Sequence, residues 1–377
     1  MPPCLENEKN AKTASTRWGN MKIHAINRRN VLQLGTGMAI GLTLAPYKAN
    51  AAEEAKLNIY GWDNYFGPDA LANFNKDTGI TAKLDVFSSN DEMFAKLKAG
   101  NPGYDVIIPA ANWVERFVKA KMLMPLDHGK IPNIKNYEKE FMDGEFDPGR
   151  KYSLAYVWGT FGIGYRKSKA KTKPDSWKYL LESSDFDGRI SIQADQEYAL
   201  GLALQNLGFN WNSTNATELN KAKDVLIAAK KHIKLFAKDN GDLLLGSNDV
   251  DICAEFSGDL LTAINADTAH DLDYVLPVEG GNRWQDTLAI AAGAPHPENA
   301  HAYINWICDA KVNAQIMESI NYATPNAAAK AIASEGYRNN TAIFPPEAAL
   351  KKAEPSRYLG EDATLVREDL WTAVQAA

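Results

Sequence analysis

Two residues whose chemistry suits a cationic ligand, Trp284 and Asp286, stand two positions apart after a pair of glycines. The apolar run 287–290 follows directly and predicts a strand, in which side chains two positions apart point to the same side. An aromatic ring attracts a cation, and a carboxylate accepts charge-assisted hydrogen bonds from an ammonium group. The pair therefore indicates an alkyl-ammonium site, and the alternative is a core tryptophan beside a solvated aspartate.

The first half of the chain alternates strands and helices in the order that builds an open parallel sheet. Ser89 and Glu92 form a capping box for the second helix, and Gly79 ends the first one. Ligands of such sheets bind at the carboxyl ends of strands, and Trp62 and Tyr65 follow the first strand. We expect strands at 56–62, 80–87 and 104–109 and helices at 69–77, 90–100 and 112–122.

The long apolar segment 152–165 is interpreted as a strand pair or as a segment that leaves a first lobe. A second α/β unit starts near Gly188, the chain returns at 280–290, and it crosses again at 321–326. Three crossings between two α/β lobes predict a hinged, two-lobed α/β fold with a cleft between the lobes. In the second half we expect strands at 190–192, 250–254 and 272–277 and helices at 198–207, 218–231, 260–265 and 300–309.

The N-terminal segment 1–51 has the order of a signal peptide. Arg28 and Arg29 precede a short apolar stretch, which ends near the small-residue pattern Ala49-Asn50-Ala51. The twin arginine predicts export by the twin-arginine route with cleavage near Ala51, and an uncleaved membrane anchor is the alternative. Met21 is a possible second start site.

Charge and motif content restrict the function classes. Residues 1–51 hold seven Lys/Arg and two Asp/Glu, so the rest of the chain has a net charge of −11, against −6 for the whole chain. Such an acidic protein suits cationic ligands and argues against nucleic acid as a partner. Cys253 and Cys308 form no metal motif, and we expect buried free thiols, no metal and no cofactor. No nucleophile, zinc or nucleotide motif supports an enzyme; the remote alternative is a hydrolase that uses Asp259 and Asp286.

The chain resembles the spermidine/putrescine-binding proteins of bacterial polyamine ABC importers over nearly all of 56–377. Six short motifs carry the resemblance by their number, order and spacing, and they lie at 60–65, 89–97, 104–109, 157–160, 279–290 and 322–326. The resemblance implies the type II periplasmic-binding fold, a monomer, a periplasmic location and delivery of a polyamine to a permease in the inner membrane. It implies an N-terminal lobe of 52–158 plus 287–322 and a C-terminal lobe of 159–286 plus 323–377.

The family's site is an aromatic box with carboxylates at its ends. By resemblance, the box residues are Trp62, Tyr65, Phe256, Trp284 and Tyr322, and the acids are Asp195, Asp259 and Asp286. Other roles stay open for three of them: Asp195 as a helix N-cap, Asp259 as a charge at a helix N-terminus, and Phe256 as a core residue.

Several positions depart from the family pattern, namely Asn64, Asn112, Tyr198 and Ser356. Asn64 and Tyr198 stand where the family carries an acid, although Glu197 is adjacent. Fewer carboxylates argue against a triply charged amine, so we favour putrescine over spermidine. Another small organic cation, or a role as a polyamine sensor, is the alternative for the same fold.

Overall fold

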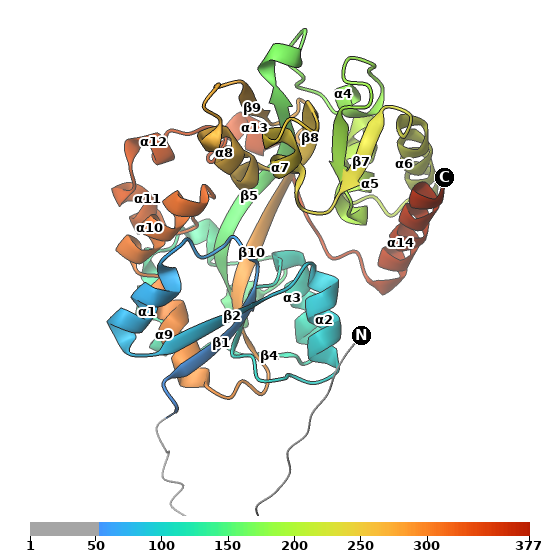
Figure 1. The fold of residues 1–377 in the computed structure, drawn as a ribbon. Helices are drawn as coiled ribbons and strands as arrows, with labels where there is room; N and C mark the ends of the chain where they lie inside the picture. The colour runs from blue at the N-terminus through green and yellow to red at the C-terminus, as the bar shows by residue number, and fades with distance from the viewer. Residues whose placement is uncertain (1–52) are drawn as a thin grey trace, which may run out of the picture. The chain divides into compact units, whose positions relative to one another are not determined.

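The structure is a computed structural model that describes residues 53–377 (Figure 1). Contacts group residues 52–377 into one compact unit. The predicted signal peptide and its cleavage site lie outside the described residues. Within residues 53–377, no helix is both long enough and apolar enough to cross a membrane.

The first part of the sheet confirms the predicted alternation of strands and helices. Strand β1 (Lys56–Gly61) lies between β2 (Thr81–Val86) and β3 (Val106–Ile107), and both pairings are parallel. Helix α1 (Ala70–Thr78) ends at Gly79 in the left-handed conformation, as predicted. Helix α2 (Asn90–Lys98) starts at the predicted cap Ser89, whose side chain accepts from the Glu92 backbone N–H, and α3 (Ala111–Lys119) follows β3.

Two long strands run through the sheet and connect its two parts. Strand β10 (Asn282–Ala291) pairs with β3 on one side and with β5 (Ser153–Arg166) on the other, both antiparallel. The second half of β5 pairs with β8 (Ile252–Phe256) and β9 (Leu272–Val275). The predicted segment 152–165 is thus one crossing strand rather than a strand pair.

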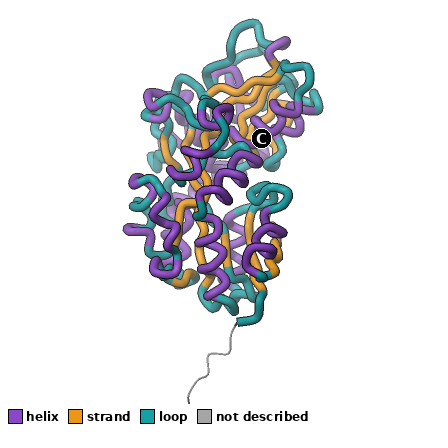
Figure 2. The backbone as a smooth tube through the Cα atoms, turned by 90° about the vertical axis from the view of Figure 1, so that its left-hand side faces the viewer, coloured by secondary structure: helices purple, strands orange, loops and turns teal. Residues whose placement is uncertain are grey.

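The second part of the sheet continues in the order β5-β8-β6-β7. Strand β6 (Ile190–Gln193) is parallel to both β8 and β7 (Ile233–Ala237). Helices cover the strands on both sides (Figure 2). The remaining elements are β4 (Leu123–Met124), β11 (Glu354–Pro355), α4 (Lys178–Leu181), α5 (Gln196–Asn206), α6 (Ala216–Ala229), α7 (Gly241–Gly246), α8 (Ser257–Ala266), α9 (Pro297–Ile307), α10 (Ala310–Ile320), α11 (Ala327–Ile332), α12 (Glu335–Arg338), α13 (Glu347–Leu350) and α14 (Glu361–Ala376), with short 3₁₀ turns between 128 and 169.

Close packing against β5 explains the glycines of its second half. A side chain at Gly162 would meet the Tyr274 hydroxyl, and one at Gly164 would meet Leu260. These glycines therefore allow helix α8 and strand β9 to approach the strand, and they have no role in binding a nucleotide. Cys253 and Cys308 are buried and unpaired, as predicted.

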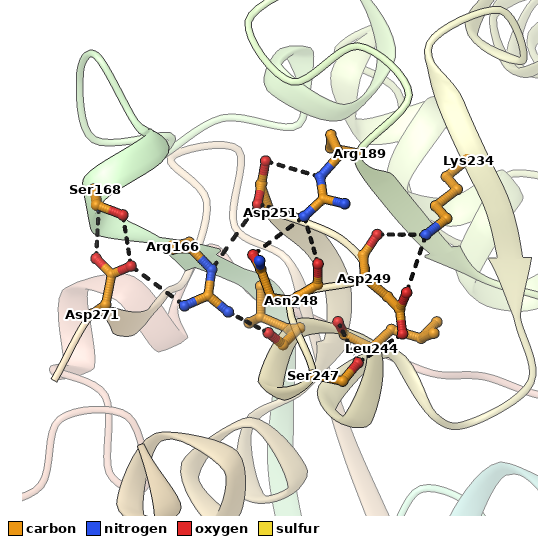
Figure 3. Close-up of polar contacts among 11 residues, drawn as sticks. Arg166, Ser168, Arg189, Lys234, Leu244, Ser247, Asn248, Asp249, Asp251 and Asp271 are labelled. Carbon is orange, nitrogen blue, oxygen red and sulfur yellow. Dashed lines mark hydrogen bonds and ion pairs between the residues drawn. The ribbon is translucent and has the colours of Figure 1, made fainter. Parts of the chain in front are cut away.

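A polar network fastens the second part of the sheet at the end where β5 stops and β6 and β8 start (Figure 3). Arg166 donates to Asp271 (3.3 Å) and to the Leu245 carbonyl (2.7 Å). Arg189 donates to both carboxylate oxygens of Asp251, at 3.1 and 3.0 Å. Four strands or their adjoining loops, β5, β6, β8 and β9, are thus tied to one another and to α7 at this end of the sheet.

Replacing Arg166 by Ala should lower the free energy of unfolding by about 1–3 kcal/mol, because the Asp271 carboxylate and the Leu245 carbonyl lose their shared donor. Urea unfolding of the purified protein measures this change. The matched control is Lys171→Ala, which removes an exposed ion pair with Asp185 (2.6 Å) and should cost less than about 1 kcal/mol. Equal losses in both variants would show that the network contributes no more than a surface pair.

Candidate functional site

All eight residues predicted for the site line one cavity of about 600 Å³. The structure thus brings together side chains that are up to 260 positions apart in the chain. They come from the carboxyl ends of β1, β6 and β8, from the first turn of α8, from the first half of β10, and from the segment after α10. They are Trp62, Tyr65, Asp195, Phe256, Asp259, Trp284, Asp286 and Tyr322.

Trp284 is the centre of the aromatic wall. Its ring stacks on Tyr65 (centroids 6.5 Å apart) and meets Tyr322 and Phe256 edge-on, at 5.0 and 5.6 Å. The ring centroids of Trp62 and Tyr65 lie 6.3 Å apart. Only 5% of Trp284 is exposed, so it also belongs to the hydrophobic core. This tryptophan is therefore both a core residue and part of the cavity wall.

Asp286 lies in the same wall, two positions after Trp284 on β10, as the sequence predicts. The Tyr65 hydroxyl donates to its carboxylate at 2.5 Å. Burial raises the pKa of Asp286 to about 7, and the nearby carboxylates of Asp239 and Glu197 also raise it. A shift in the pairing of β10 with β5 falls directly after Asp286, and such irregularities re-aim side chains next to binding sites.

A second acidic group surrounds Asp259, which lies in the first turn of α8. Tyr322 donates to Asp259 at 2.7 Å, and Asn64 donates to its other oxygen at 2.5 Å. Carboxylate oxygens of Asp239, Glu255 and Asp259 all lie within 4.8 Å of one another. Burial, followed by repulsion from Asp239, raises the pKa of Asp259 to about 7. Negative charge is thus concentrated here, close enough for one cation to contact more than one carboxylate.

A third acidic group lies at the start of α5. Asp195 is the N-cap of this helix and accepts from the Glu197 backbone N–H at 2.7 Å, so its capping role is confirmed while it also lines the cavity. Asn112 of α3 donates to the Glu197 carboxylate at 3.2 Å. Burial, followed by repulsion from Asp195, raises the pKa of Glu197 to about 7.

Within the described part of the chain, these acids form no ion pairs, although the buried Arg367 lies near enough to Asp195 and Glu197 to offset part of the rise in their pKa values. Among residues 53–377, no ion pair with Lys, Arg or His involves Asp195, Glu197, Asp239, Asp259 or Asp286. Their hydrogen-bond donors are neutral hydroxyl, amide and backbone groups. A buried carboxylate without a cation is costly, and an ammonium group in the cavity would remove that cost.

Sequence reasoning missed Asp239, which also lines the cavity. It follows β7, and Gln193 holds it by two hydrogen bonds, at 3.2 and 3.0 Å. We expected no element between 232 and 249, where the structure has β7 and α7. The short alternating run at 233–237, followed by Asn240-Gly241, is the signal that would have placed Asp239 at a strand end.

The positions that depart from the family pattern also line the cavity, together with Glu197. Tyr198 stacks its ring edge against Phe256, with centroids 5.0 Å apart. Asn64 and Asn112 donate to acids across the cavity rather than supplying charge themselves. The four positions that depart from the family pattern and line the cavity are Asn64, Asn112, Tyr198 and Ser356.

The strand order, the two crossing strands and a deep cavity at the strand ends define a two-lobed binding protein of the periplasmic type. The chain belongs to the bacterial extracellular solute-binding protein family, whose model matches residues 69–345. This family consists of solute-binding proteins rather than enzymes, in agreement with the prediction from the sequence.

Curated relatives and solved structures agree with this assignment. The chain is 30% identical to the putrescine-binding periplasmic protein PotF of Escherichia coli K12, over 93% of this chain and 99% of the relative. It is 32% identical to the putrescine-binding periplasmic protein SpuD of Pseudomonas aeruginosa, over 87% of this chain and 94% of that relative. A putative spermidine/putrescine ABC transporter protein from Listeria monocytogenes superposes with a TM-score of 0.81 at 30% identity, over 85% of this chain and 99% of that one.

Replacing Asp286 by Asn should stabilise the ligand-free protein, and more at pH 8 than at pH 5. The pKa of Asp286 rises from about 4 in the unfolded chain to about 7 in the folded one. Between these two pKa values, Asp286 keeps a proton in the folded protein that it has lost in the unfolded chain. The stability that this protonation contributes is lost as the pH rises through 7. The gain in unfolding free energy should be on the order of 2 kcal/mol larger at pH 8.

Urea unfolding at the two pH values measures the difference. Asp224→Asn, a change of the same kind on the exposed face of α6, is the control and should show no such dependence. A gain from Asp286→Asn that is the same at pH 5 and pH 8 would contradict the raised pKa.

Proposed function

We propose that this protein is the periplasmic solute-binding component of an ABC importer for polyamines, with putrescine as the favoured ligand. The observation that carries the proposal is a cavity with an aromatic wall and five carboxylates that form no ion pairs among residues 53–377, those of Asp195, Glu197, Asp239, Asp259 and Asp286, of which Asp286 is almost fully buried. The names of the relatives PotF and SpuD support putrescine as the ligand.

In the proposed complex, the two ends of the diamine use different acids. One ammonium group binds Asp286, whose carboxylate already accepts from Tyr65, and the other binds Asp259 with its neighbour Asp239. The rings of Trp284 and Tyr322 cover the alkyl chain. Each charge-assisted hydrogen bond contributes roughly 1.5–3 kcal/mol and each ring over a cation roughly 0.5–2 kcal/mol. A few of each support a micromolar ligand, which needs about 8 kcal/mol.

Binding is proposed to close a hinge. The lobes are 52–158 plus 287–322 and 159–286 plus 323–377, and β5 and β10 run between them. A ligand that contacts residues of both lobes stabilises the closed form by its differential affinity. The permease in the inner membrane then recognises the closed, monomeric protein. Residues 1–51 act as a twin-arginine signal peptide that directs the protein to the periplasm and is cleaved near Ala51.

Spermidine is the second candidate ligand, and one observation favours it. The acids that line the cavity form three groups, around Asp259, Asp286 and Asp195, and Asp239 and Glu197 raise their total charge above the sequence-based expectation. A triamine would supply one cationic centre for each group. The cavity therefore holds more carboxylates than the three that the sequence predicted.

Isothermal titration of the protein with putrescine, spermidine, spermine, cadaverine and γ-aminobutyrate tests the proposal. We expect saturable one-to-one binding of putrescine, with proton release at pH 7 because the bound cation lowers the raised pKa values of the cavity acids. Tighter binding of spermidine would agree with a polyamine-binding protein but would make spermidine, rather than putrescine, the favoured ligand. No heat with any of the amines would refute the proposed function.

Asp286→Asn should weaken putrescine binding at least tenfold, about 1.4 kcal/mol, because the amide keeps the shape but loses the charge that binds the ammonium group. Fluorescence titration measures the dissociation constant. Asp224→Asn, on the exposed face of α6, is the control and should bind like the wild type. Unchanged binding in Asp286→Asn would remove Asp286 from the site.

A further inference from the structure

We propose that Arg116 of α3 and Glu361 of α14 form a latch outside the cavity, which slows opening of the closed protein and so prolongs retention of the bound ligand. Arg116 acts as a positioning residue, since it does not line the cavity. The retention part of this inference rests on the proposed function, whereas the latch itself does not need a ligand.

The contact between the two side chains is a two-point ion pair. The Arg116 Nη2 donates to Glu361 Oε2 at 2.9 Å, and Nε lies 2.8 Å from Oε1. The Tyr358 hydroxyl donates to the same Oε1 at 2.9 Å. The pair therefore combines one charge-assisted hydrogen bond with a second close ionic contact, which restrains the two side chains more than a single contact would.

Two aromatic rings also contact the guanidinium of Arg116. It lies 4.4 Å from the ring centroid of Phe94 and 4.7 Å from that of Trp113. Asp91 adds a longer ionic contact at 3.7 Å. These contacts with Phe94, Trp113 and Asp91 restrain the Arg116 side chain independently of Glu361. A preordered partner loses less conformational entropy on pairing than a typical surface arginine.

The latch joins two separate hydrophobic cores. Val114 and Phe117 of α3 pack with Tyr60 and Phe94 in a core beneath β1 and β3. Trp371 of α14, together with Val374, packs in the core of α5 and α6. Figure 1 shows α14 alongside α6 with its first turn directed toward α2 and α3. Any motion that separates the two cores on this side must therefore break the pair.

The position of the latch lets it act on opening of the protein without contact with the ligand. Asn112, one turn before Arg116 on α3, donates to Glu197 of α5 inside the cavity. The latch holds the same helix, α3, close to α14, which packs against α5, from outside the cavity. If release requires opening, a substitution that removes the ion pair lowers the barrier to dissociation. It leaves the contacts with the ligand unchanged.

Stopped-flow measurement of putrescine dissociation tests the latch in the full-length protein. Arg116→Gln and Glu361→Gln should each raise the dissociation rate about three- to tenfold, as expected for an ion pair worth up to about 1.4 kcal/mol. The double variant should dissociate no faster than the faster single variant, because both changes remove the same contact. Raised salt should shrink the difference from the wild type.

The matched control removes an exposed ion pair that lies within one part of the protein. Lys171 and Asp185 approach to 2.6 Å, and neither lines the cavity. Lys171→Gln and Asp185→Asn should leave the dissociation rate unchanged. Wild-type rates in both latch variants, or effects that add in the double variant, would overturn the inference.

A ligand-free measurement separates failure of the latch from failure of the proposed function. Spin labels on cysteines introduced at the exposed positions Lys76 of α1 and Asp224 of α6, in a protein that carries Cys4→Ser, report the distance between the two parts, since Cys253 and Cys308 are buried. Arg116→Gln should lower the population with the short distance about three- to tenfold. An unchanged population overturns the latch, and absence of amine binding with a changed population overturns only the proposed function.

Discussion

Uncompensated negative charge in a buried cavity is the constraint on which the rest of this structure depends. Asp286 is almost fully buried, and Asp259 shares its surroundings with Asp239 and Glu255. Hydroxyls, amides and backbone N–H groups satisfy the oxygens as hydrogen-bond acceptors, but none of them neutralises the charge. The ligand-free protein therefore stores electrostatic energy that a cation releases on binding.

The fold maintains this unfavourable arrangement because its stability comes from elsewhere. The strands that carry the acids at their carboxyl ends are buried along most of their length by two large hydrophobic cores. At the opposite end of the second part of the sheet, Arg166 and Arg189 are paired with Asp271 and Asp251. Charges are thus compensated where the sheet is fastened and left uncompensated where a ligand has access, as expected when function is supported at a cost in stability.

Local patterns predicted most of the fold, because helix caps and strand alternation are properties of short segments. The Ser89 cap and the Gly79 stop lie where expected, and Trp284 and Asp286 share a cavity because side chains alternate along a strand. The capping box itself differs in one respect: the Glu92 side chain accepts from Ser88 rather than from Ser89. Such a choice depends on loop geometry that a motif does not encode.

The remainder of the site depends on contacts between distant segments, which no local pattern predicts. Asp239 follows a five-residue strand that was not recognised, and its proximity to Asp259 is created by the pairing of β6 with both β7 and β8. Arg116 and Glu361 are 245 positions apart, and each alone has the pattern of an ordinary charged residue on a helix surface. The carboxylates in the cavity and the ion pair outside it have complementary effects: the first make a cation favourable inside, and the second resists the separation that would expose it. The carboxylates therefore act on binding by direct contact with the cation, whereas the ion pair acts through the equilibrium between the closed and open forms.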